Sequence, residues 1–432
     1  MIQTEIGIIG CVILVAIILM GVNIGFAMII VGLIGFGLIV GWPAALLNTA
    51  ILAFDKMNNY GFSVLPLFLL MGAFVSQGGI GKMAYDTARA WLGQFKGGLA
   101  IATVGASGLF AAVSGSSLAG SLIMGKIAYP EMRKAGYDVP LSAGVISAGG
   151  TLGILIPPSM AFILLGILAD LSIGELFFAG LFPGISEALF YMATIYIMCK
   201  INPRLAPVMV APTWREKWLS LRLTWPVLLL FLMVMGGLYT GKFTATEAGA
   251  IGAFGALVIS LARRRMSGKA FWDSLMDTAK MTAMIIVILI GAYTFNAFLA
   301  VTRIPFTLSE LIAGLDVSRW IIYAIIVIIY IIFGCFFDIY AIIILTVPVI
   351  YPTIAALGFD LIWYSVIMVR VVEIGMITPP FGINLFGILG VIDAPLTKIY
   401  RGVIPFIIAD LFNLVFLSAF PIIATFLPYS MR

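Results

Sequence analysis

The sequence lacks histidine altogether, holds only three cysteines and has few charged residues, and each shortage excludes a class of function. Without histidine, the chain lacks the commonest proton relay and metal ligand, so enzyme mechanisms that need an imidazole are excluded. Cys11, Cys199 and Cys335 stand singly inside apolar runs, without the paired spacing of a disulfide framework or a metal cluster. The chemistry of this chain must therefore come from other side chains or from the backbone.

Only 10% of the 432 residues are charged, whereas 62% are hydrophobic. That leaves too little polar surface to cover a soluble globule, so we predict an all-α polytopic membrane protein. Residues 1–3 carry no basic run and no small-residue cleavage site follows, which favours a retained first span over a signal peptide. Apolar runs of near-spanning length occupy residues 7–20, 22–40, 62–77, 178–199, 225–241, 246–262, 281–300 and 403–427.

One segment of the sequence occurs twice. Residues 116–158 and 338–380 align without a gap at an offset of 222. Basic residues stand beside the Tyr-Pro pair of the first copy, whereas residues 351–360 of the second copy contain none. Because basic residues stay on the cytoplasmic side of a membrane, we interpret the two copies as inverted repeats. The matched pairs include Tyr129 with Tyr351, Asp138 with Asp360, Gly153 with Gly375, and Pro157-Pro158 with Pro379-Pro380.

The distribution of basic residues also predicts the orientation of the chain. With the N-terminus outside, most of the 24 basic residues fall on the inner side, which fits the positive-inside rule. Residues 200–222 combine tryptophans with basic residues and favour either an interfacial helix on the inner surface or an ordinary solvated loop. The basic residues placed outside are Lys56, Lys242, Arg303, Arg319 and Arg432.

Each repeat predicts a re-entrant hairpin. Two short apolar arms meet at a polar tip within residues 98–130, and the same shape recurs within residues 320–352. Each arm is expected to be too short to cross a bilayer alone. A hairpin that turns back at mid-membrane is tolerated only where protein or a water-filled cavity satisfies its exposed backbone.

Each hairpin is followed by a span that a Pro-Pro pair interrupts, within residues 141–169 and 361–392. Two prolines remove two backbone donors and free the carbonyls one turn earlier, and such carbonyls suit a hard cation such as sodium. A single Pro-Pro would more simply be a kink, but two matched breaks favour ion binding. The expected first sodium site comprises Ser116, Ser117, Gly153, Ile156 and Pro158. The expected second site comprises Gly334, Phe337, Gly375, Thr378 and Pro380.

Half-helices that begin after the breaks point their positive ends toward the same cavity, which favours an anionic substrate. Asp338 is expected either to cap the second hairpin arm or to add charge to the sodium site. Arg370 and Glu373 lie three residues apart, so they either pair with each other or leave Arg370 to bind a substrate carboxylate. Asp410 and Glu187 are expected only to pair or to mark membrane edges. The candidate substrate contacts are Ser114, Ser117, Ser159, Asp338, Arg370 and Asn384.

The motifs around Ser114–Ala119, Gly153–Ser159 and Glu373–Gly382 resemble those of the large membrane subunit of tripartite ATP-independent periplasmic (TRAP) transporters. The resemblance covers nearly the whole chain and implies the ion transporter superfamily fold, with a static scaffold and a mobile transport domain. It further implies sodium-coupled uptake, by an elevator mechanism, of an organic anion such as a C4-dicarboxylate, sialic acid or a sugar acid. The implied coupling ion is Na⁺, at two or more sites.

The resemblance also implies partners and a location. A soluble periplasmic binding protein would deliver the substrate, and a small four-helix membrane subunit, expected as a separate chain, would complete the complex. The location implied is the bacterial inner membrane. The expected division of the chain is N-terminal scaffold helices at 1–61, a first repeat at 62–222, connecting helices at 223–280 and a second repeat at 281–432.

Three other functions compete with this interpretation. A stand-alone sodium-coupled dicarboxylate or citrate carrier would share the repeats but need no binding protein. An intramembrane enzyme is disfavoured because no base accompanies Ser116. A channel would not need two opposed hairpins with matched breaks. We therefore expect a transporter and no enzymatic activity.

Overall fold

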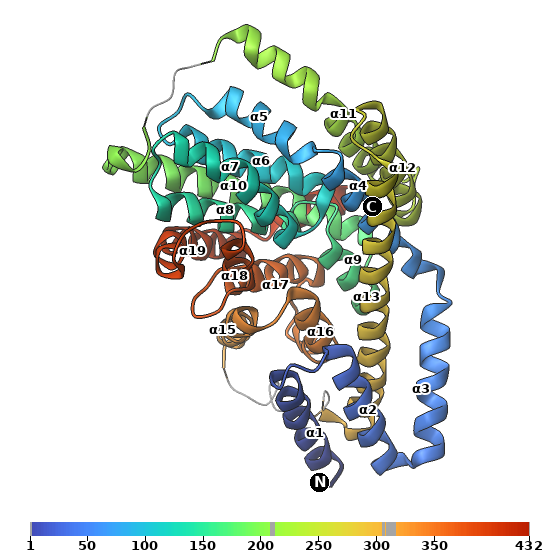
Figure 1. Cartoon of the computed structure of the whole chain (residues 1–432). Helices are drawn as coiled ribbons and strands as arrows, with labels where there is room; N and C mark the ends of the chain where they lie inside the picture. Colours follow the sequence, from blue (N-terminus) through green and yellow to red (C-terminus); the bar gives the residue numbers. More distant parts are fainter. Residues whose placement is uncertain (1, 208–211, 305–306, 308–316, 432) are drawn as a thin grey trace.

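A computed structural model describes residues 2–207, 212–304, 307 and 317–431, and every regular element in that part is a helix (Figure 1). By length and composition, eight of the described helices could cross a membrane, or nine if the bent helix α11 counts as one span. The prediction of an all-helical polytopic membrane protein is thus confirmed. The elements before the first expected hairpin are α1 Ile2–Leu19, α2 Ile24–Val40, α3 Trp42–Met57, η1 Tyr60–Ser63, α4 Val64–Gln77 and α5 Ile80–Leu92.

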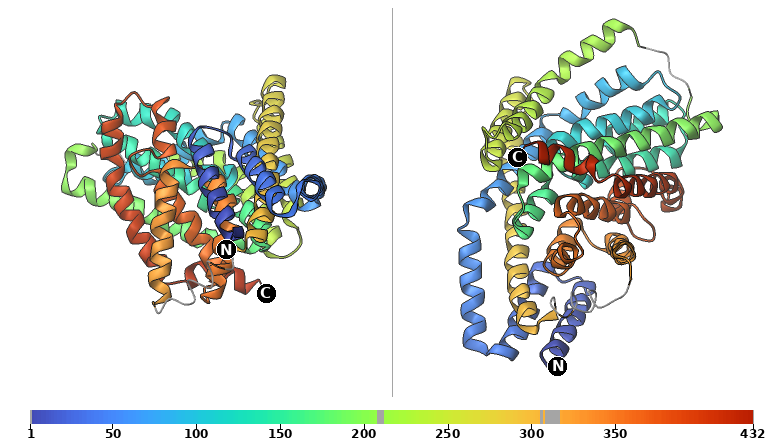
Figure 2. Two further views of the ribbon diagram at one scale, coloured as in Figure 1. Left: turned by 90° about the horizontal axis from the view of Figure 1, so that it is seen from below. Right: turned by 180° about the vertical axis from the view of Figure 1, so that it is seen from behind.

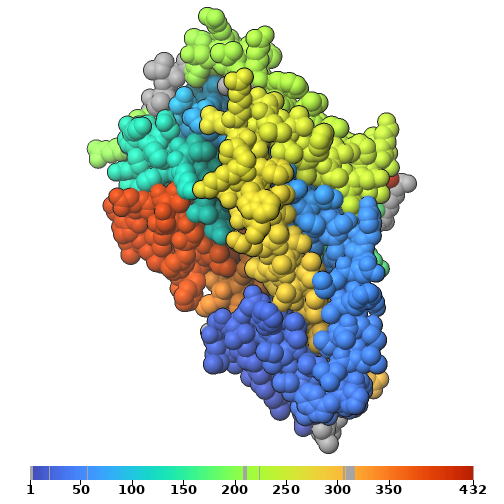
Figure 3. All heavy atoms as spheres, turned by 45° about the vertical axis from the view of Figure 1, so that its right-hand side comes forward, coloured from blue at the N-terminus to red at the C-terminus, as the bar shows by residue number. Residues whose placement is uncertain are grey.

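The helices form two groups. The peripheral bundle consists of α1–α4 and α11–α13, and its long helix α13 contacts α2, α3 and α4. Figure 1 and the right view of Figure 2 show α3 and α13 along one side of the molecule, and Figure 3 shows α13 packed beside the N-terminal helices. The helices that complete the peripheral bundle are α11 Trp214–Tyr239, α12 Ala245–Ala262 and α13 Gly268–Thr302.

The central bundle contains both sequence repeats. Its broken helices are the most buried, since every residue of α8 from Leu141 and every residue of α17 from Ile362 is enclosed. Helices that are enclosed on all sides contact other helices rather than lipid. The first half comprises α6 Gly98–Ser114, α7 Ser117–Lys134, α8 Val139–Leu155, α9 Met160–Ala169, α10 Ile173–Ile201 and η2 Pro203–Leu205. The second half comprises α15 Arg319–Phe336, α16 Ile339–Ala356, α17 Leu361–Met376, α18 Ile383–Leu389, α19 Leu396–Ala419 and α20 Ile422–Ser430.

The matched sequences form matched elements. Helices α7 and α16 begin and end at equivalent positions of the alignment. Asp138 caps α8 by accepting a hydrogen bond from the third residue of that helix, and Asp360 caps α17 in the same way. The turn before each cap contains a left-handed glycine, Gly136 at φ 78° and Gly358 at φ 73°, a conformation that only glycine adopts without strain. Both Pro-Pro bonds are cis.

Some expected boundaries are wrong. The run at 403–427 is not one span, because α19 ends at Ala419 and α20 starts after Pro421. The division expected after residue 222 coincides with the bend in α11, whereas the division expected after residue 280 falls inside α13, so that helix continues across it. Helices α15 and α16 have 18 residues each and are apolar enough to span, so the expectation that every arm is too short is also wrong.

The region expected as an interfacial helix or a loop contains both kinds of structure. Helix α10 continues to Ile201, and η2 follows it. Helix α11 starts at Trp214 with a capping box, in which Thr213 and Glu216 exchange hydrogen bonds, and it bends by 53° after Arg222. Only residues 214–222 can therefore form the expected helix. Arg432, expected on the outside, lies beyond the described residues.

Candidate functional site

The first polar tip joins α6 to α7 through two residues. Gly115 adopts a left-handed φ of 63°, which ends α6 and turns the chain back. Ser116 then caps α7, and its hydroxyl accepts a hydrogen bond from the backbone N–H of Ala119 at 3.4 Å. The tip thus has the helix–turn–helix geometry expected from the sequence.

The first double proline breaks its helix. Helix α8 ends at Leu155, and α9 starts after Ser159, whose side chain accepts from the N–H of Phe162. Since the two prolines have no N–H, the carbonyls of Gly153 and Ile154 lose their donors one turn later. The prediction that the helix is interrupted at the double proline is confirmed here.

The first tip packs directly against this break. A Cβ placed on Gly153 would lie 2.6 Å from the carbonyl oxygen of Ser116, and one on Gly115 would lie 2.8 Å from the carbonyl oxygen of Pro158. Only glycine permits backbones to approach so closely. Four of the expected first-site residues (Ser116, Ser117, Gly153 and Pro158) therefore lie at one junction, while Ile156 lies in the extended segment between the half-helices.

The second tip meets the second break in the same manner. Helix α15 ends at Phe336, and Asp338 caps α16 by accepting from the N–H of Tyr340 at 3.1 Å, which confirms its expected capping role. A Cβ on Gly375 would lie 2.5 Å from the Cα of Gly334. The N–H of Gly382 donates to the carbonyl of Cys335 at 3.1 Å, across the same junction.

Two other residues expected in the second sodium site already have partners. The hydroxyl of Thr378 donates to the carbonyl of Ile374 at 2.6 Å, which leaves its oxygen lone pairs available. The carbonyl of Pro380 accepts a hydrogen bond from the hydroxyl of Tyr400. Phe337 is in extended backbone and half buried at the tip.

A polar contact links the two repeats. The Nδ2 of Asn384, on α18, donates to the hydroxyl of Ser117 at the first tip at 2.5 Å. The Oδ1 of Asn384 and the hydroxyl of Ser114 are buried without any hydrogen-bond partner. Buried polar atoms are normally satisfied, so these two unpaired oxygens beside the first tip are candidate contacts for an ion or a substrate. Ser159, also expected here, is fully buried.

These junctions fit a cation with oxygen ligands. Among the described residues, no cluster of three or more His, Cys, Asp or Glu could hold a metal ion. The available donors are instead freed carbonyls, hydroxyls and an unpaired amide oxygen, which suit a hard monovalent cation rather than a transition metal.

Asp338 also faces a cavity. A space of about 590 Å³ lies between the second tip and the connection from α1 to α2. Residues of both the central bundle and the peripheral bundle therefore line this cavity. The lining includes Asn23, Cys335, Phe337, Asp338, Phe381 and Phe386.

Arg370 lies elsewhere, in a fully buried ion cluster. Its Nη1 lies 2.8 Å from Glu187 and 3.4 Å from Glu373, its Nη2 contacts Asp410, and its Nε donates to Asn413 at 3.2 Å. The guanidinium is thus saturated by protein groups, and the expected Arg370–Glu373 pair forms within a larger cluster. Sequence reasoning missed Asn413 and also Thr151, whose hydroxyl donates to Glu187 at 2.8 Å.

A signal for this cluster does exist in the sequence. Pro183 in α10 and Pro405 in α19 are separated by the same offset of 222, and a carboxylate follows each, Glu187 four residues later and Asp410 five residues later. Ionisable side chains inside membrane helices seldom lack a partner, so these two carboxylates indicated that a counter-ion lies nearby.

The fold and its two matched junctions define a polytopic helical membrane transporter built on an internal repeat. Residues 11–423 match the model of the family described as "Tripartite ATP-independent periplasmic transporter, DctM component". The chain belongs to this family, as the resemblance predicted, and the expectation of a transporter rather than an enzyme is confirmed. It is therefore a multi-pass membrane protein of a bacterial transporter family.

Similar proteins are also named as large permease proteins of TRAP transporters. The chain is 36% identical to the C4-dicarboxylate TRAP transporter large permease protein DctM of Pseudomonas aeruginosa, over 89% of this chain and 90% of that protein. It is 30% identical to the 2,3-diketo-L-gulonate TRAP transporter large permease protein YiaN of Escherichia coli, over 88% and 92% of the two chains. A solved structure of the YdaH transporter of Alcanivorax borkumensis has the same fold, with a TM-score of 0.63 at 16% identity, over 88% of this chain and 89% of that one.

Proposed function

We propose that this chain is the permease of a sodium-coupled transporter that imports an organic anion handed over by a periplasmic binding protein. The observation that carries the proposal is the repeated junction, in which Gly153 touches the first tip and Gly375 touches the second. The first junction combines carbonyls that have lost their helical donors with a capped helix start, and the second has the same cap, with the carbonyl of Gly375 accepting from the N–H of Thr378 at 3.0 Å. One sodium ion would bind at each, so that two cations balance the charge of the substrate.

The substrate would bind between the junctions, near Asn384. Its unpaired Oδ1 and the unpaired hydroxyl of Ser114 offer polar contacts, and the N-termini of α7, α9 and α16 favour negative charge. The relatives are named for C4-dicarboxylate, sialic acid, 2,3-diketo-L-gulonate and isethionate, which are all organic anions. A carboxylate is the substrate class that this site supports best.

Movement would follow the division between the two bundles. The tips and broken helices all belong to the central bundle, while α13 and its neighbours form a separate group. In the proposed elevator mechanism, the central bundle carries substrate and sodium past the peripheral bundle, and the two tips act as re-entrant hairpins of opposite orientation. A small membrane subunit would brace the peripheral bundle in the bacterial inner membrane, with the N-terminus on the periplasmic side.

Uptake into proteoliposomes tests the coupling. The chain is reconstituted with its small subunit, and uptake from the loaded binding protein is measured against sodium concentration. Ser116→Ala and Thr378→Ala should raise the sodium concentration for half-maximal uptake. Their matched controls are Ser172→Ala, which removes the cap of α10, and Thr425→Ala, which removes another hydroxyl-to-carbonyl bond.

Two results would overturn parts of the proposal. Equal uptake in sodium-free buffer would remove the coupling, and full uptake of free substrate without the binding protein would favour the stand-alone carrier. A sodium shift in Ser172→Ala or Thr425→Ala as large as in the site variants would assign the effect to helix stability rather than to ion binding.

A further inference from the structure

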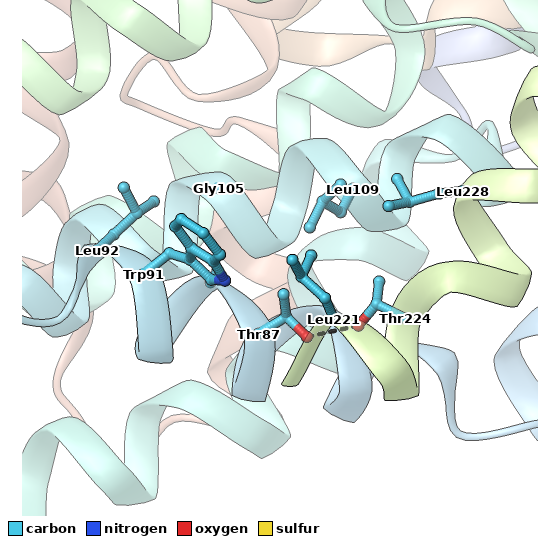
Figure 4. Close-up of a pocket in the computed structure, with 9 residues that line it drawn as sticks. Thr87, Trp91, Leu92, Gly105, Leu109, Leu221, Thr224 and Leu228 are labelled. Atoms are coloured by element: carbon cyan, nitrogen blue, oxygen red, sulfur yellow. Dashed lines mark hydrogen bonds between the residues drawn. The ribbon is translucent and has the colours of Figure 1, made fainter. Parts of the chain in front are cut away.

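A second cavity lies where α5, α6 and α11 meet. It has a volume of about 440 Å³ and opens between the three helices (Figure 4). We name it the α5–α11 groove. Its lining residues are Thr87, Ala88, Trp91, Leu92, Gly105, Leu109, Leu221, Thr224 and Leu228.

The groove offers its occupant an apolar wall. Its only hydroxyls belong to Thr87 and Thr224, which bond to each other at 2.5 Å, and Thr87 also donates to the carbonyl of Ser220 at 3.1 Å. These bonds use the donor hydrogens of both hydroxyls. A peptide segment placed here would bury backbone polar groups without partners, whereas a hydrocarbon chain would not.

One donor in the groove is unpaired. The indole Nε1 of Trp91 is buried and has no hydrogen-bond partner. Edge-to-face contacts with Trp214 at 6.4 Å and Trp218 at 6.2 Å position the ring at one end of the lining. A buried N–H without an acceptor is unfavourable, so an occupant with an oxygen at this end of its apolar body would satisfy it.

Positive charge lies next to this donor. Lys217 stands one helical turn before Leu221, on the same face of α11, and its ammonium donates to Gln94 at 3.0 Å while lying 4.9 Å from the ring of Trp214. Arg222 and the rings of Trp214 and Trp218 are exposed around it. Tryptophan interleaved with basic residues is typical of a helix at the lipid headgroup level.

We propose that the α5–α11 groove binds an anionic phospholipid. One acyl chain lies along the leucine-lined groove, the indole N–H of Trp91 donates to an ester or phosphate oxygen, and Lys217 and Arg222 attract the headgroup. The lipid would touch α6, whose far end carries Ser114 of the first tip. This inference stands on the groove alone and does not depend on the proposed substrate or coupling ion.

The test uses the complete permease complex in nanodiscs that contain phosphatidylglycerol with a photoreactive group on one acyl chain. Labelling should concentrate in peptides from α5, α6 and the middle of α11. Trp91→Phe, which keeps the ring and removes the donor, should reduce labelling about two- to tenfold. Lys217→Gln should reduce it about fivefold, through the loss of one headgroup attraction.

The control substitutions lie on α11, outside the residues that line the groove. Trp225→Phe and Arg215→Gln change exposed side chains and should leave labelling unchanged. Equal losses in these variants, labelling scattered over all lipid-facing helices, or equal labelling by a phosphatidylethanolamine probe would each overturn the proposal. Protection of the groove by the small subunit, with no lipid label, would assign it to a protein contact instead.

Lipid extraction provides a test that does not depend on whether the variants fold. Mass spectrometry of the unmodified purified complex should detect phosphatidylglycerol or another anionic lipid retained after detergent washing. Its absence would overturn the proposal even if the variants proved unstable.

Discussion

The guanidinium of Arg370 lies 2.8 Å from the carboxylate of Glu187 in a fully enclosed ion pair that joins the two sequence repeats. Glu187 belongs to α10 of the first repeat, and Arg370 belongs to α17 of the second. Two further carboxylates, Glu373 and Asp410, contact the same guanidinium. The single cation therefore holds α10, α17 and α19 together in the core of the central bundle.

Removal of this cation should be severely destabilising. Arg370→Met leaves three buried carboxylates without a counter-charge, and the loss of one partner from a buried ion pair costs about 3–5 kcal/mol. Thermal unfolding of the purified chain in detergent measures the effect. The control is Arg89→Met, which breaks a half-exposed pair with Glu131 at 3.4 Å and should cost about 0–1 kcal/mol. Similar melting temperatures for the two variants would contradict the structural role of Arg370.

Substitution of one carboxylate in this cluster should destabilise the chain less than substitution of the arginine. They outnumber the guanidinium by three to one, and the Oε1 of Glu373 has no hydrogen-bond partner. Glu373→Gln keeps the volume and removes one excess negative charge, so it should destabilise the chain far less than Arg370→Met does. The comparison uses the same thermal unfolding assay. If the Glu373→Gln chain proved as unstable as the Arg370→Met chain, the idea that the cluster holds more carboxylates than the guanidinium needs would be wrong.

The sequence predicted the parts of the site that local rules determine. The caps at Ser116 and Asp338, the glycine turns and the two breaks follow from backbone chemistry, and the repeat supplied each of them twice. The pair of Arg370 with Glu373 was predictable because both residues lie on one helix face.

Other features depend on tertiary packing. The partners Glu187 and Asp410 come from α10 and α19, and no local pattern reports which distant helices meet. The break after Ala419 was missed because an apolar run continues through Pro421, so hydropathy alone did not mark the end of the helix. The arms after the tips were underestimated for a related reason, since α7 and α16 continue through Pro130 and Pro352, where the apolar runs end.

Methyl groups at the junction glycines should abolish transport. The Cβ of Gly153→Ala would meet the backbone of Ser116, and that of Gly375→Ala would meet the backbone of Gly334, so neither clash can be relieved by a side-chain rotation. Overpacking of this kind costs about 1–3 kcal/mol. Uptake into proteoliposomes should fall by about tenfold or more. Gly236→Ala is the control, because a methyl group there meets nothing within 4 Å.

The outcome of this comparison discriminates between two roles of the glycines. If the close approach serves packing alone, the two variants should lose thermal stability in proportion to their loss of uptake. If it forms the sites, uptake should fall in chains that still unfold near the wild-type temperature. Normal uptake by both variants would contradict the junction geometry.

Asn384 should control the affinity for the anion. Its amide donates to Ser117 across the repeats, while its buried Oδ1 has no partner. Asn384→Asp replaces the amide donor with a carboxylate, which can only accept from the hydroxyl of Ser117 and would repel a negatively charged substrate. The KM for the anion should rise by about tenfold or more, whereas the sodium requirement should not increase, because the added negative charge favours a cation. Asn202→Asp, at an exposed cap beside η2, is the matched control. A higher sodium requirement with an unchanged KM would place Asn384 with the ion rather than with the substrate.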